Sequence, residues 1–333
     1  MYPRVSVLWL NYNTLHILPL VKRVLERLAD LDYPDYELII VDNASNDGSW
    51  EVLRDYITAH IVPKVDVKIQ RLSKNYGFTG GYNAAYAMRD EESKYVVLVN
   101  TDALPIEEIV RIYVSFMELH SDVGAAQGVV AGMGRHRHKV DSAGGYIDEL
   151  LRVHFPFRSA PLNPLLKALG DRPLELSFVE GVMPIYRVEY IEEVCYYPNR
   201  LYISAGFMYY LEDVLLSLAL WNKGYRSLLI PEHVGYHFRS AIVRKQNRKG
   251  KHVYYAMRNR LALISSLGTS YKPVVLAGYI RRILISRIPR NLVIKALVDG
   301  MRLGARLKRY TASIQVNRAP RLCSGVWKVI REL

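Results

Sequence analysis

The stretch KYVVLVNTDALPIEEIVRIYVSFMELH, residues 94–120, contains the unit that decides the fold. Residues 94–99 form a short, mostly apolar run, which is typical of a strand buried on both faces. Polar residues and a proline follow, and residues 106–120 then have the apolar spacing of a helix. The stretch therefore predicts a strand, a polar strand end and a returning helix.

The same unit recurs toward the N-terminus. We expect strands at residues 5–10, 36–41 and 65–72, and helices at 14–30, 48–60 and 81–90. Apolar strands that alternate with helices are typical of a parallel sheet covered on both faces. The predicted fold class is α/β, with an open, doubly wound, mostly parallel sheet.

The pattern changes in the second third of the chain. Residues 125–132 indicate a strand, and residues 131–172 indicate loops or a small antiparallel insertion, because Gly, Pro, His and Arg are frequent there. A helix is expected at 209–225 and a strand at 227–231. After about residue 250 we expect mainly helices, with an amphipathic one at 274–288.

The charge of the chain is unevenly distributed. The 333 residues are 50% hydrophobic and carry a net charge of +13, which fits a globular protein with one large core or two domains. Residues 241–333 hold 21 Lys and Arg and two acidic residues, whereas the first 240 residues have a net charge of −6. This asymmetry indicates an anionic partner, either a membrane surface or a nucleic acid.

Several classes of protein are disfavoured. Cys195 and Cys323 lie far apart without a CxxC or Cys/His cluster, which argues against a zinc site or a disulfide framework. The N-terminus begins as a strand, so we expect no signal peptide. No stretch reaches the roughly 18 apolar residues of a membrane span. We expect a cytoplasmic protein.

Polar residues follow three of the predicted strands. They are Asn11 to Asn13, Asp42 with Asn43, and Asn100 to Asp102. Ligands of open parallel sheets bind at these carboxyl ends. Asp42 also fits a turn or cap role, and Asp102 also fits an N-cap of the next helix.

A glycine-rich segment, NYGFTGGYN, occupies residues 75–83. Without Cβ atoms, Gly77, Gly80 and Gly81 would let backbone N–H groups and a helix start approach an anion such as a phosphate. The spacing differs from GxGxxG and from the Walker motif, so an ordinary glycine-rich turn is the alternative.

Six segments together resemble one enzyme family. They are VSVLWLNYN, VDNASNDGS, NYGFTGGYN, LVNTDALP, YLEDVLL and YYAMRNRL. Their order and approximate spacing, over about residues 3–265, resemble the family 2 glycosyltransferases, and in particular their rhamnosyltransferase-like branch. The resemblance implies a GT-A fold and inverting transfer from a nucleotide sugar, and it does not specify the sugar.

The resemblance assigns a donor site. Residues that would line the base and ribose pocket, contact the base or run along the nucleotide are Leu10, Asn11, Tyr12, Asn13, Asp42, Asn43, Asn75, Gly77, Gly80, Gly81 and Asn83. Tyr255, Arg258 and Asn259 match a late motif. Arg258 would pair with a phosphate, or would be one base of a solvated basic face.

The resemblance also implies a metal. Asn100, Thr101 and Asp102 match the triplet usually written DxD, with Asn in place of the first acid. Asp102 would hold Mg²⁺ or Mn²⁺ on the diphosphate, because a hard cation on a carboxylate neutralises the charge of the leaving group. His237 is expected near the second metal or diphosphate position, with a structural histidine as the alternative.

The predicted acceptor side of the site includes the start of a helix. Glu212 and Asp213 match the family's acidic pair, in which Asp213 would be the base that takes the proton of the acceptor hydroxyl. A solvated first-turn acid pair favoured by the helix dipole is the alternative. Gly181 matches a glycine beside the acceptor pocket. Leu215 and Ala219 stand where the family often has Asp and Arg, so this helix departs from the pattern.

The resemblance implies three regions. They are a nucleotide-sugar-binding half (1–125), an acceptor-binding half of the same domain (126–240) and a basic, mainly helical region (241–333). The expected partners are a UDP- or dTDP-sugar such as dTDP-rhamnose and a glycan or lipid-linked acceptor. The basic helices would either lie peripherally on an anionic membrane or pack on the domain with Lys and Arg outward.

Three other functions compete with this interpretation. A nucleotidyltransferase of related topology would need a Lys/Arg-rich loop after the first strand, and NYNTLHIL (11–18) lacks it. A nucleic-acid-binding protein would use the basic region, but no recognisable motif supports a nucleic-acid partner. A degenerate transferase that binds without transfer is disfavoured because Asp102 and Asp213 are both present.

Overall fold

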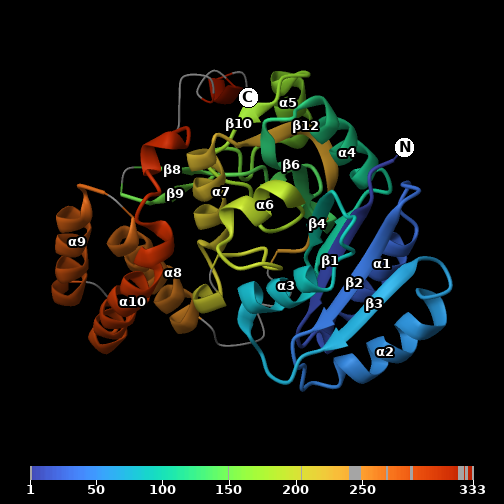
Figure 1. The fold of residues 1–333 in the computed structure, drawn as a ribbon, viewed down its shortest axis with the longest axis horizontal. Helices are drawn as coiled ribbons and strands as arrows, with labels where there is room; N and C mark the ends of the chain where they lie inside the picture. Colours follow the sequence, from blue (N-terminus) through green and yellow to red (C-terminus); the bar gives the residue numbers. More distant parts are fainter. Residues whose placement is uncertain are drawn as a thin grey trace.

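One sheet forms the centre of the molecule in the computed structural model shown in Figure 1. The structure describes residues 2–148, 150–203, 205–239, 249–267, 269–285, 288–321, 326 and 329–331. Cys323 and residues 241–248 of the predicted basic region lie outside the described residues. Cys195 is buried, and burial raises the pKa of its thiol to about 12.

The strands of this sheet follow the order β10-β12-β6-β11-β4-β1-β2-β3, with β5 beside β12 and β7 beside β6. Their bounds are β1 (Val5–Asn11), β2 (Tyr36–Asp42), β3 (Asp66–Arg71), β4 (Tyr95–Val99), β5 (Ala103–Pro105), β6 (Val123–Gly132), β7 (Val140–Ser142), β10 (Leu174–Glu175), β11 (Ile185–Arg187) and β12 (Arg226–His237). The block β4-β1-β2-β3 is parallel, whereas β11 runs antiparallel to both β4 and β6. A separate hairpin joins β8 (Tyr146–Ile147) and β9 (Val153–His154).

Helices cover both faces of the sheet. Their bounds are α1 (Leu18–Ala29), α2 (Ser49–His60), α3 (Gly77–Ala87), α4 (Ile109–Leu119), α5 (Leu162–Leu169), α6 (Val188–Val194), α7 (Glu212–Lys223), α8 (Lys249–Ser266), α9 (Lys272–Ile285) and α10 (Arg290–Thr311). Alternate residues of β1 explain this layering: Val7 and Trp9 pack with α1, α2 and α4, and Leu8 and Leu10 pack with α3, α6 and α7.

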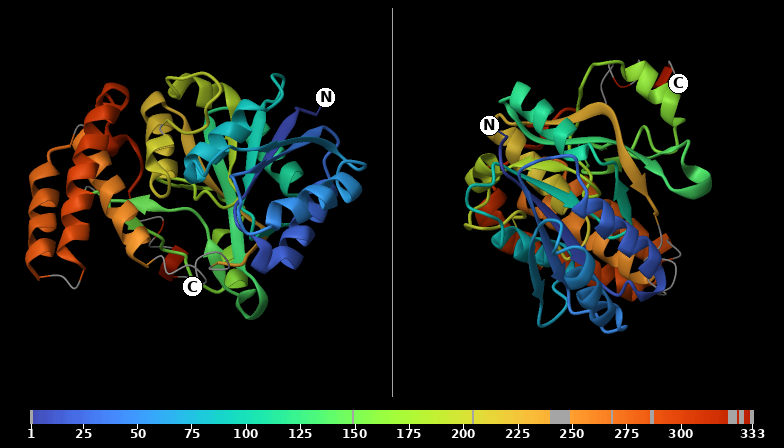
Figure 2. Two further views of the ribbon diagram at one scale, coloured as in Figure 1. Left: turned by 90° about the horizontal axis from the view of Figure 1, so that it is seen from below. Right: turned by 90° about the vertical axis from the view of Figure 1, so that its right-hand side faces the viewer.

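The predicted α/β class, the helices on both faces and the C-terminal helical extension are confirmed. Figures 1 and 2 show α9 and α10 side by side at the end of the molecule farthest from α2 and β3. No helix among the described residues is both long and apolar enough to cross a membrane. The boundaries of the three predicted regions stay a prediction, and β4, β11 and β6 join the first two regions in one sheet.

Two element predictions were wrong in their bounds. Helix α3 begins at Gly77, so the glycines lie inside its first turns rather than before it. Strand β12 continues past Pro231 to His237, because irregular pairing with β6 between Leu229 and Gly235 absorbs the proline. The small antiparallel insertion expected as one alternative within 131–172 is confirmed, because β7 pairs antiparallel with β6 and β8 with β9, and the region also contains α5.

Candidate active site

The parallel strands bring their polar ends together. Asn11 and Asp42 lie opposite each other in the register of β1 and β2, and Asn11 Nδ2 donates to Asp42 Oδ1 at 2.8 Å. Ser45 donates to the same carboxylate from its Oγ at 2.5 Å and from its backbone N at 3.0 Å. Buried Asp42 therefore organises the turn after β2, and its contact with a nucleotide base stays a prediction.

Asparagines fix the loops around this turn. Asn13 has a left-handed backbone (φ 53°) and exchanges two hydrogen bonds with Asn46, at 3.0 and 2.9 Å. Asn43 Nδ2 donates to the carbonyl oxygen of Gly77 at 2.9 Å, and Asn75 Oδ1 accepts from Gly77 N at 2.7 Å. Asn43 and Asn75 thus anchor the start of α3 at the strand ends.

The three glycines of α3 make room for protein atoms. A Cβ on Gly77, whose φ is +74°, would lie 2.8 Å from the carbonyl oxygen of Met208. A Cβ on Gly81 would lie 2.5 Å from the Leu10 side chain, and one on Gly80 would lie 2.6 Å from Cβ of Tyr76. These contacts give the glycines a packing role, and their approach to a donor stays a prediction.

Two neighbouring cavities, which share lining residues, lie beyond the strand ends, and we call them together the strand-end cleft. The first, of about 140 Å³, is lined by Leu10, Tyr12, Asn43, Phe78, Tyr82, Asn100, Thr101, Asp102 and Tyr209. The second, of about 300 Å³, shares Tyr12 and Tyr209 and is also lined by Asn75, Met208, Tyr210, Lys251, His252 and Tyr255. Sequence reasoning did not identify Tyr209, Tyr210, Lys251 or His252. The two tyrosines lie just before the acidic pair of YLEDVLL, and the two basic residues lie just before YYAMRNRL, but neither segment assigned a role to them.

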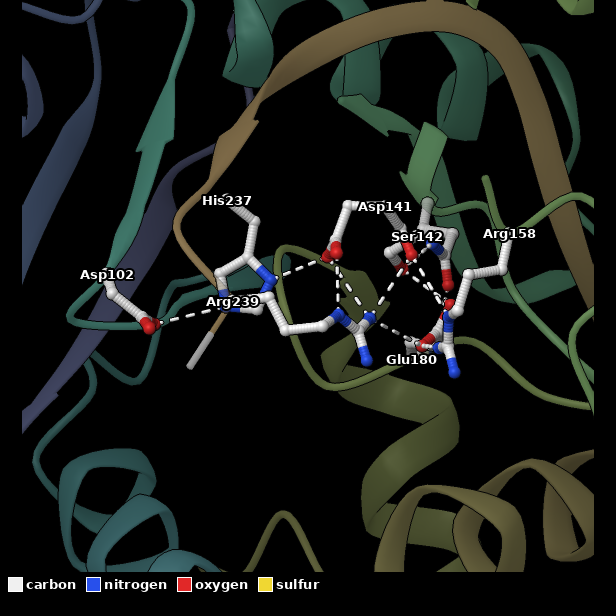
Figure 3. Close-up of polar contacts among 8 residues, drawn as sticks. Asp102, Asp141, Ser142, Arg158, Glu180, His237 and Arg239 are labelled. Carbon is white, nitrogen blue, oxygen red and sulfur yellow. Dashed lines mark hydrogen bonds and ion pairs between the residues drawn. The ribbon is translucent and has the colours of Figure 1, made fainter. Parts of the chain in front are cut away.

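Two predicted ligands of a metal meet at one side of the cleft. Strand β5 starts directly after Asp102 and pairs with the end of β12, so Ala103 lies opposite His237. The Nε2 atom of His237 is 3.1 Å from Asp102 Oδ1, and its Nδ1 atom is 2.7 Å from Asp141 Oδ2 (Figure 3). His237 is the last residue of β12 rather than a residue after the strand, which was the expectation.

The donor set fits a cation that arrives with a diphosphate. Adjacent ligands of an octahedral Mg²⁺ with bonds of about 2.1 Å lie about 3 Å apart, as the facing atoms of Asp102 and His237 do. Asp141 orients the imidazole from its other nitrogen, as second partners of metal ligands do. Within the described part of the chain no group of three or more His, Cys, Asp or Glu could hold a metal ion. The other ligands would therefore be phosphate oxygens and water.

A chain of charged side chains continues behind His237, from buried Asp141 and Glu180 to the more exposed Arg239 and Arg158 (Figure 3). Arg239 Nε donates to Asp141 at 2.6 Å, and Arg239 Nη2 lies 4.0 Å from Glu180 Oε2. Glu180 accepts a hydrogen bond from Arg158 at 2.5 Å. Burial alone would raise the pKa of Asp141, but hydrogen bonds from His237 and Arg239 outweigh it and lower that pKa to about 2. No sequence motif indicates this chain, because its members come from segments distant in sequence, and Asp141 meets His237 only because β7 and β12 both pair with β6.

The imidazole of His237 is charged in this arrangement. Burial alone would lower its pKa, but the hydrogen bonds to Asp102 and Asp141 outweigh that effect and raise the pKa to about 9. A divalent cation on Nε2 must therefore displace a proton.

The predicted acidic pair lies at the start of α7. Glu212 is 8% exposed and Asp213 is half-buried, so a solvated pair does not fit. Burial raises the pKa of Asp213 to about 7, with Glu180 adding to the effect and the N–H groups of Val214 and Gly181 opposing it. Burial and then the charge of Asp213 raise the pKa of Glu212 well above its ordinary value. The pair thus carries at most about one charge near neutral pH, on Asp213.

Gly181 connects the acidic pair with the strand-end cleft. Its backbone interacts with the Asp213 carboxylate. A Cβ on Gly181 would lie 3.2 Å from the ring of Phe78, which lines the cleft. The predicted acceptor-side glycine therefore lies between the cleft and the predicted base.

Two predicted nucleotide-binding residues bind the protein instead of facing the cleft. Arg258 donates to the carbonyl oxygens of Gly206 and Phe207 at 2.7 and 2.8 Å. Asn83 Nδ2 donates to the carbonyl oxygen of Tyr202 at 3.1 Å, and Asn83 Oδ1 accepts from the backbone N–H of Tyr202 at 2.8 Å. Both hold the segment 202–211, whose tyrosines line the cleft, so any effect on a nucleotide would act through that segment.

Solved structures share this architecture. TarS from S. aureus is 18% identical with a TM-score of 0.53, over 92% of this chain and 50% of the TarS chain. The mannosyltransferase PcManGT from Pyrobaculum calidifontis, in complex with GDP-Man and Mn²⁺, is 19% identical with a TM-score of 0.54, over 93% and 76% of the two chains. GalNAc-T7, with UDP, GalNAc and Mn²⁺, is 14% identical with a TM-score of 0.60, over 93% and 59%.

At sequence identities this low, the likeness to these structures shows a shared fold. The chain spans about half the length of the TarS chain that it matches. No curated protein sequence matches the chain. The sheet and its two helical layers are those of a GT-A fold. The family model described as glycosyl transferase family 2 matches residues 6–195, and the chain belongs to this family. The match ends before α7, so the roles of Glu212 and Asp213 rest on their geometry and motif.

Proposed function

We propose that the chain is an inverting, metal-dependent glycosyltransferase that moves a sugar from a UDP- or dTDP-sugar to a glycan or lipid-linked acceptor. We favour dTDP-rhamnose as the donor, because the motifs resemble the rhamnosyltransferase-like branch. The observation that carries the proposal is the Asp102–His237 pair, 3.1 Å apart, at strand ends that border a cavity. The Mn²⁺ in the PcManGT and GalNAc-T7 complexes supports it.

The donor would occupy the strand-end cleft. Leu10 and Tyr12 border the part of the cleft assigned to base and ribose, and Asp102 and His237 would hold Mg²⁺ or Mn²⁺ beside the diphosphate. The cation would neutralise charge on the leaving nucleoside diphosphate. Lys251 lines the second cavity of the cleft, and its positive charge would also favour a bound diphosphate.

Asp213 would act on the acceptor. The acceptor oxygen attacks the anomeric carbon from the face opposite the leaving group, the bond to the diphosphate oxygen breaks, and the acceptor proton passes to the Asp213 carboxylate. One displacement of this kind inverts the anomeric centre. A pKa of about 7 makes Asp213 a stronger base than an ordinary aspartate and still leaves it ionised near neutral pH. Glu212 stays protonated beside it and can donate a hydrogen bond.

The test is calorimetric titration with a panel of nucleotide sugars and their free diphosphates, with Mn²⁺ and with a chelator. We expect one donor to bind with Mn²⁺ to the wild type and not to Asp102→Ala. The surface variant Asp171→Ala is the matched control and should bind like the wild type. Failure of all nucleotides to bind the wild type would refute the proposal.

We also propose an anionic membrane surface as a partner of α9 and α10. Residues 272–311 contain ten Lys and Arg and one acidic residue, Asp299. The same helices expose large apolar side chains, namely Val274 (56%), Ile280 (57%), Leu284 (65%), Ile285 (67%), Ile294 (47%) and Val298 (41%). Exposed apolar residues among positive charges are the chemistry that inserts into an anionic interface.

Vesicle flotation tests this partner. The wild type should float with vesicles of anionic phospholipid and not with zwitterionic vesicles. The double variant Ile280→Ser/Leu284→Ser should lose most of this binding. Val52→Ser/Val62→Ser, which removes two exposed apolar side chains near α2, should keep it. Equal flotation of both double variants would contradict the assignment.

A further inference from the structure

A separate cavity of about 440 Å³ lies beside the acidic pair, and we call it the lateral cavity. It is lined by Leu151, Arg152, Val153, Phe155, Phe178, Tyr210, Leu211, Glu212, Asp213, Val214, Ala256, Met257, Arg260, Tyr279 and Arg282. Most of these residues come from the β8–β9 hairpin, α7, α8 and α9. Tyr210 borders both this cavity and the strand-end cleft, so a molecule in the lateral cavity lies next to the predicted base.

The walls of the lateral cavity are largely apolar. Phe178 and Met257 are buried, and Phe155 meets Phe178 edge to face with 6.0 Å between ring centroids. A sugar alone would place its hydroxyls against side chains that offer no hydrogen bonds, which is unfavourable. An alkyl chain or a ring system would instead be stabilised by the area that it buries. The occupant therefore needs an apolar part.

Three arginines give the cavity an excess of positive charge. Arg152 pairs with Asp148 at 2.6 Å, and Arg260 donates to the carbonyl oxygen of Leu150 at 2.7 Å. No carboxylate of the described residues forms an ion pair with Arg282. Burial lowers the pKa of Arg260, and the charges of Arg282 and Arg152 act in the same direction. An anionic group among these side chains would relieve their repulsion and form charge-assisted hydrogen bonds.

A buried polar atom in the wall also lacks a partner. Glu212 Oε2 makes no hydrogen bond with any described residue, although the side chain is only 8% exposed. An unpartnered buried carboxyl atom is costly. A hydroxyl of a bound molecule would satisfy it and would lie beside Asp213.

We infer that the lateral cavity binds the acceptor, and that this acceptor is an amphipathic anion: an apolar chain or ring that carries a phosphate-like group and a hydroxyl. The apolar part lies against Phe155 and Met257, the anion lies among the arginines, and the hydroxyl reaches the acidic pair. This inference rests on the proposed function, because it assigns the acceptor class for the same transfer. Helix α9 supplies Tyr279 and Arg282 to the cavity and exposes Ile280 and Leu284 to the outside, which suits an acceptor held in a membrane.

Calorimetry with three probes below their micelle concentrations tests the inference. Decyl phosphate combines both features, decyl β-glucoside has only the apolar chain, and inorganic phosphate has only the anion. We expect decyl phosphate to bind the full chain one to one, at least tenfold more tightly than either other probe. If decyl β-glucoside binds as tightly as decyl phosphate, the site does not require an anionic group. If inorganic phosphate binds as tightly as decyl phosphate, the site does not require an apolar part. Either result would refute the inference.

Two variants locate the binding. Arg282→Gln should weaken decyl phosphate at least fivefold, whereas its neighbour Arg281→Gln, which does not line the cavity, should change it less than twofold. Val153→Phe should narrow the cavity and weaken decyl phosphate at least fivefold. Equal effects of Arg282→Gln and Arg281→Gln, with no effect of Val153→Phe, would overturn the site.

Donor binding with Mn²⁺ separates this inference from the proposed function. It should be unchanged in Arg282→Gln and Val153→Phe, which also shows that the variants are folded. If the donor binds the wild type and decyl phosphate does not, this inference fails while the proposed function stands. If decyl phosphate binds and no nucleotide does, the cavity is a ligand site, but its assignment to an acceptor fails.

Discussion

Replacing Asp213 by Asn should change the pH dependence of stability. The pKa of Asp213 is about 7 in the folded protein and has a reference value of 3.8, so the folded state binds this proton more tightly than the unfolded state. The folded state is therefore favoured below about pH 4, loses stability as the pH rises from about 4 to about 7, and stays at the lower level above that. The amide of the Asp213→Asn variant is neutral at every pH in this range, so the variant would lack this loss.

The magnitude follows from the two pKa values. A difference of about three pKa units corresponds to about 4 kcal/mol if all of it appears in stability. Because Asp213 is half-buried and shares its charge with Glu212, we expect about 1–3 kcal/mol after solvent screening. Asp213→Asn should thus be more stable than the wild type by this amount at pH 8 and about equal to it at pH 4.

Urea unfolding followed by circular dichroism between pH 4 and pH 8 measures the effect. Other titrating groups are common to both proteins, so they cancel in the difference between the two curves. Asp171→Asn, at an exposed position, should follow the wild type and controls for a surface substitution. Parallel curves for the wild type and Asp213→Asn would refute the raised pKa of this carboxyl.

Three further predictions concern the rest of the site. Asp141→Asn removes the carboxylate that orients His237, so Mn²⁺ affinity in the presence of donor diphosphate, measured by calorimetry, should fall about 10- to 100-fold; unchanged affinity would contradict the orienting role. Gly77→Ala should destabilise the fold by about 2–4 kcal/mol, because its φ is +74° and a Cβ would meet a backbone carbonyl at 2.8 Å. Gly250 is a helical position with open space around it, so Gly250→Ala should instead stabilise the fold by about 0.5–1 kcal/mol. Urea midpoints of both variants equal to that of the wild type would contradict the two glycine predictions. The transfer rate should rise with pH through about 7 as Asp213 ionises, and a rate independent of pH between 5 and 8 would contradict its role as the base.

The sequence predicted the sheet well because its strands carry a strong local signal. Each of β1, β2 and β4 is a short apolar run followed by polar residues, and parallel pairing then brings Asn11, Asp42 and Asn100 to one edge without further information. Strand β12 was predicted too short, because Pro231 normally ends a strand and here lies at an irregular pairing with β6. Strands β5, β10 and β11 were not predicted, because segments of two or three residues carry no periodic pattern.

The site was only partly predictable, because side chains can be diverted to the protein itself. Arg258 and Asn83 belong to motifs of the donor site. In the structure, however, both side chains form hydrogen bonds with backbone groups of the segment 202–211. Conversely, Asp141 carries no motif and reaches His237 only because β7 and β12 both pair with β6. Long-range contacts of this kind leave no local pattern.

The most direct test of the account separates donor binding from turnover in two variants. With Mn²⁺, the donor and a mixture of acceptors, release of nucleoside diphosphate and calorimetric donor binding are measured for the wild type, Asp102→Asn and Asp213→Asn. The account predicts that Asp102→Asn loses both donor binding and turnover. It predicts that Asp213→Asn keeps donor binding but loses turnover by a factor on the order of 100 to 10,000. Full turnover by Asp213→Asn would contradict the account. Donor binding that is unchanged both in Asp102→Asn and in the presence of a chelator would also contradict it.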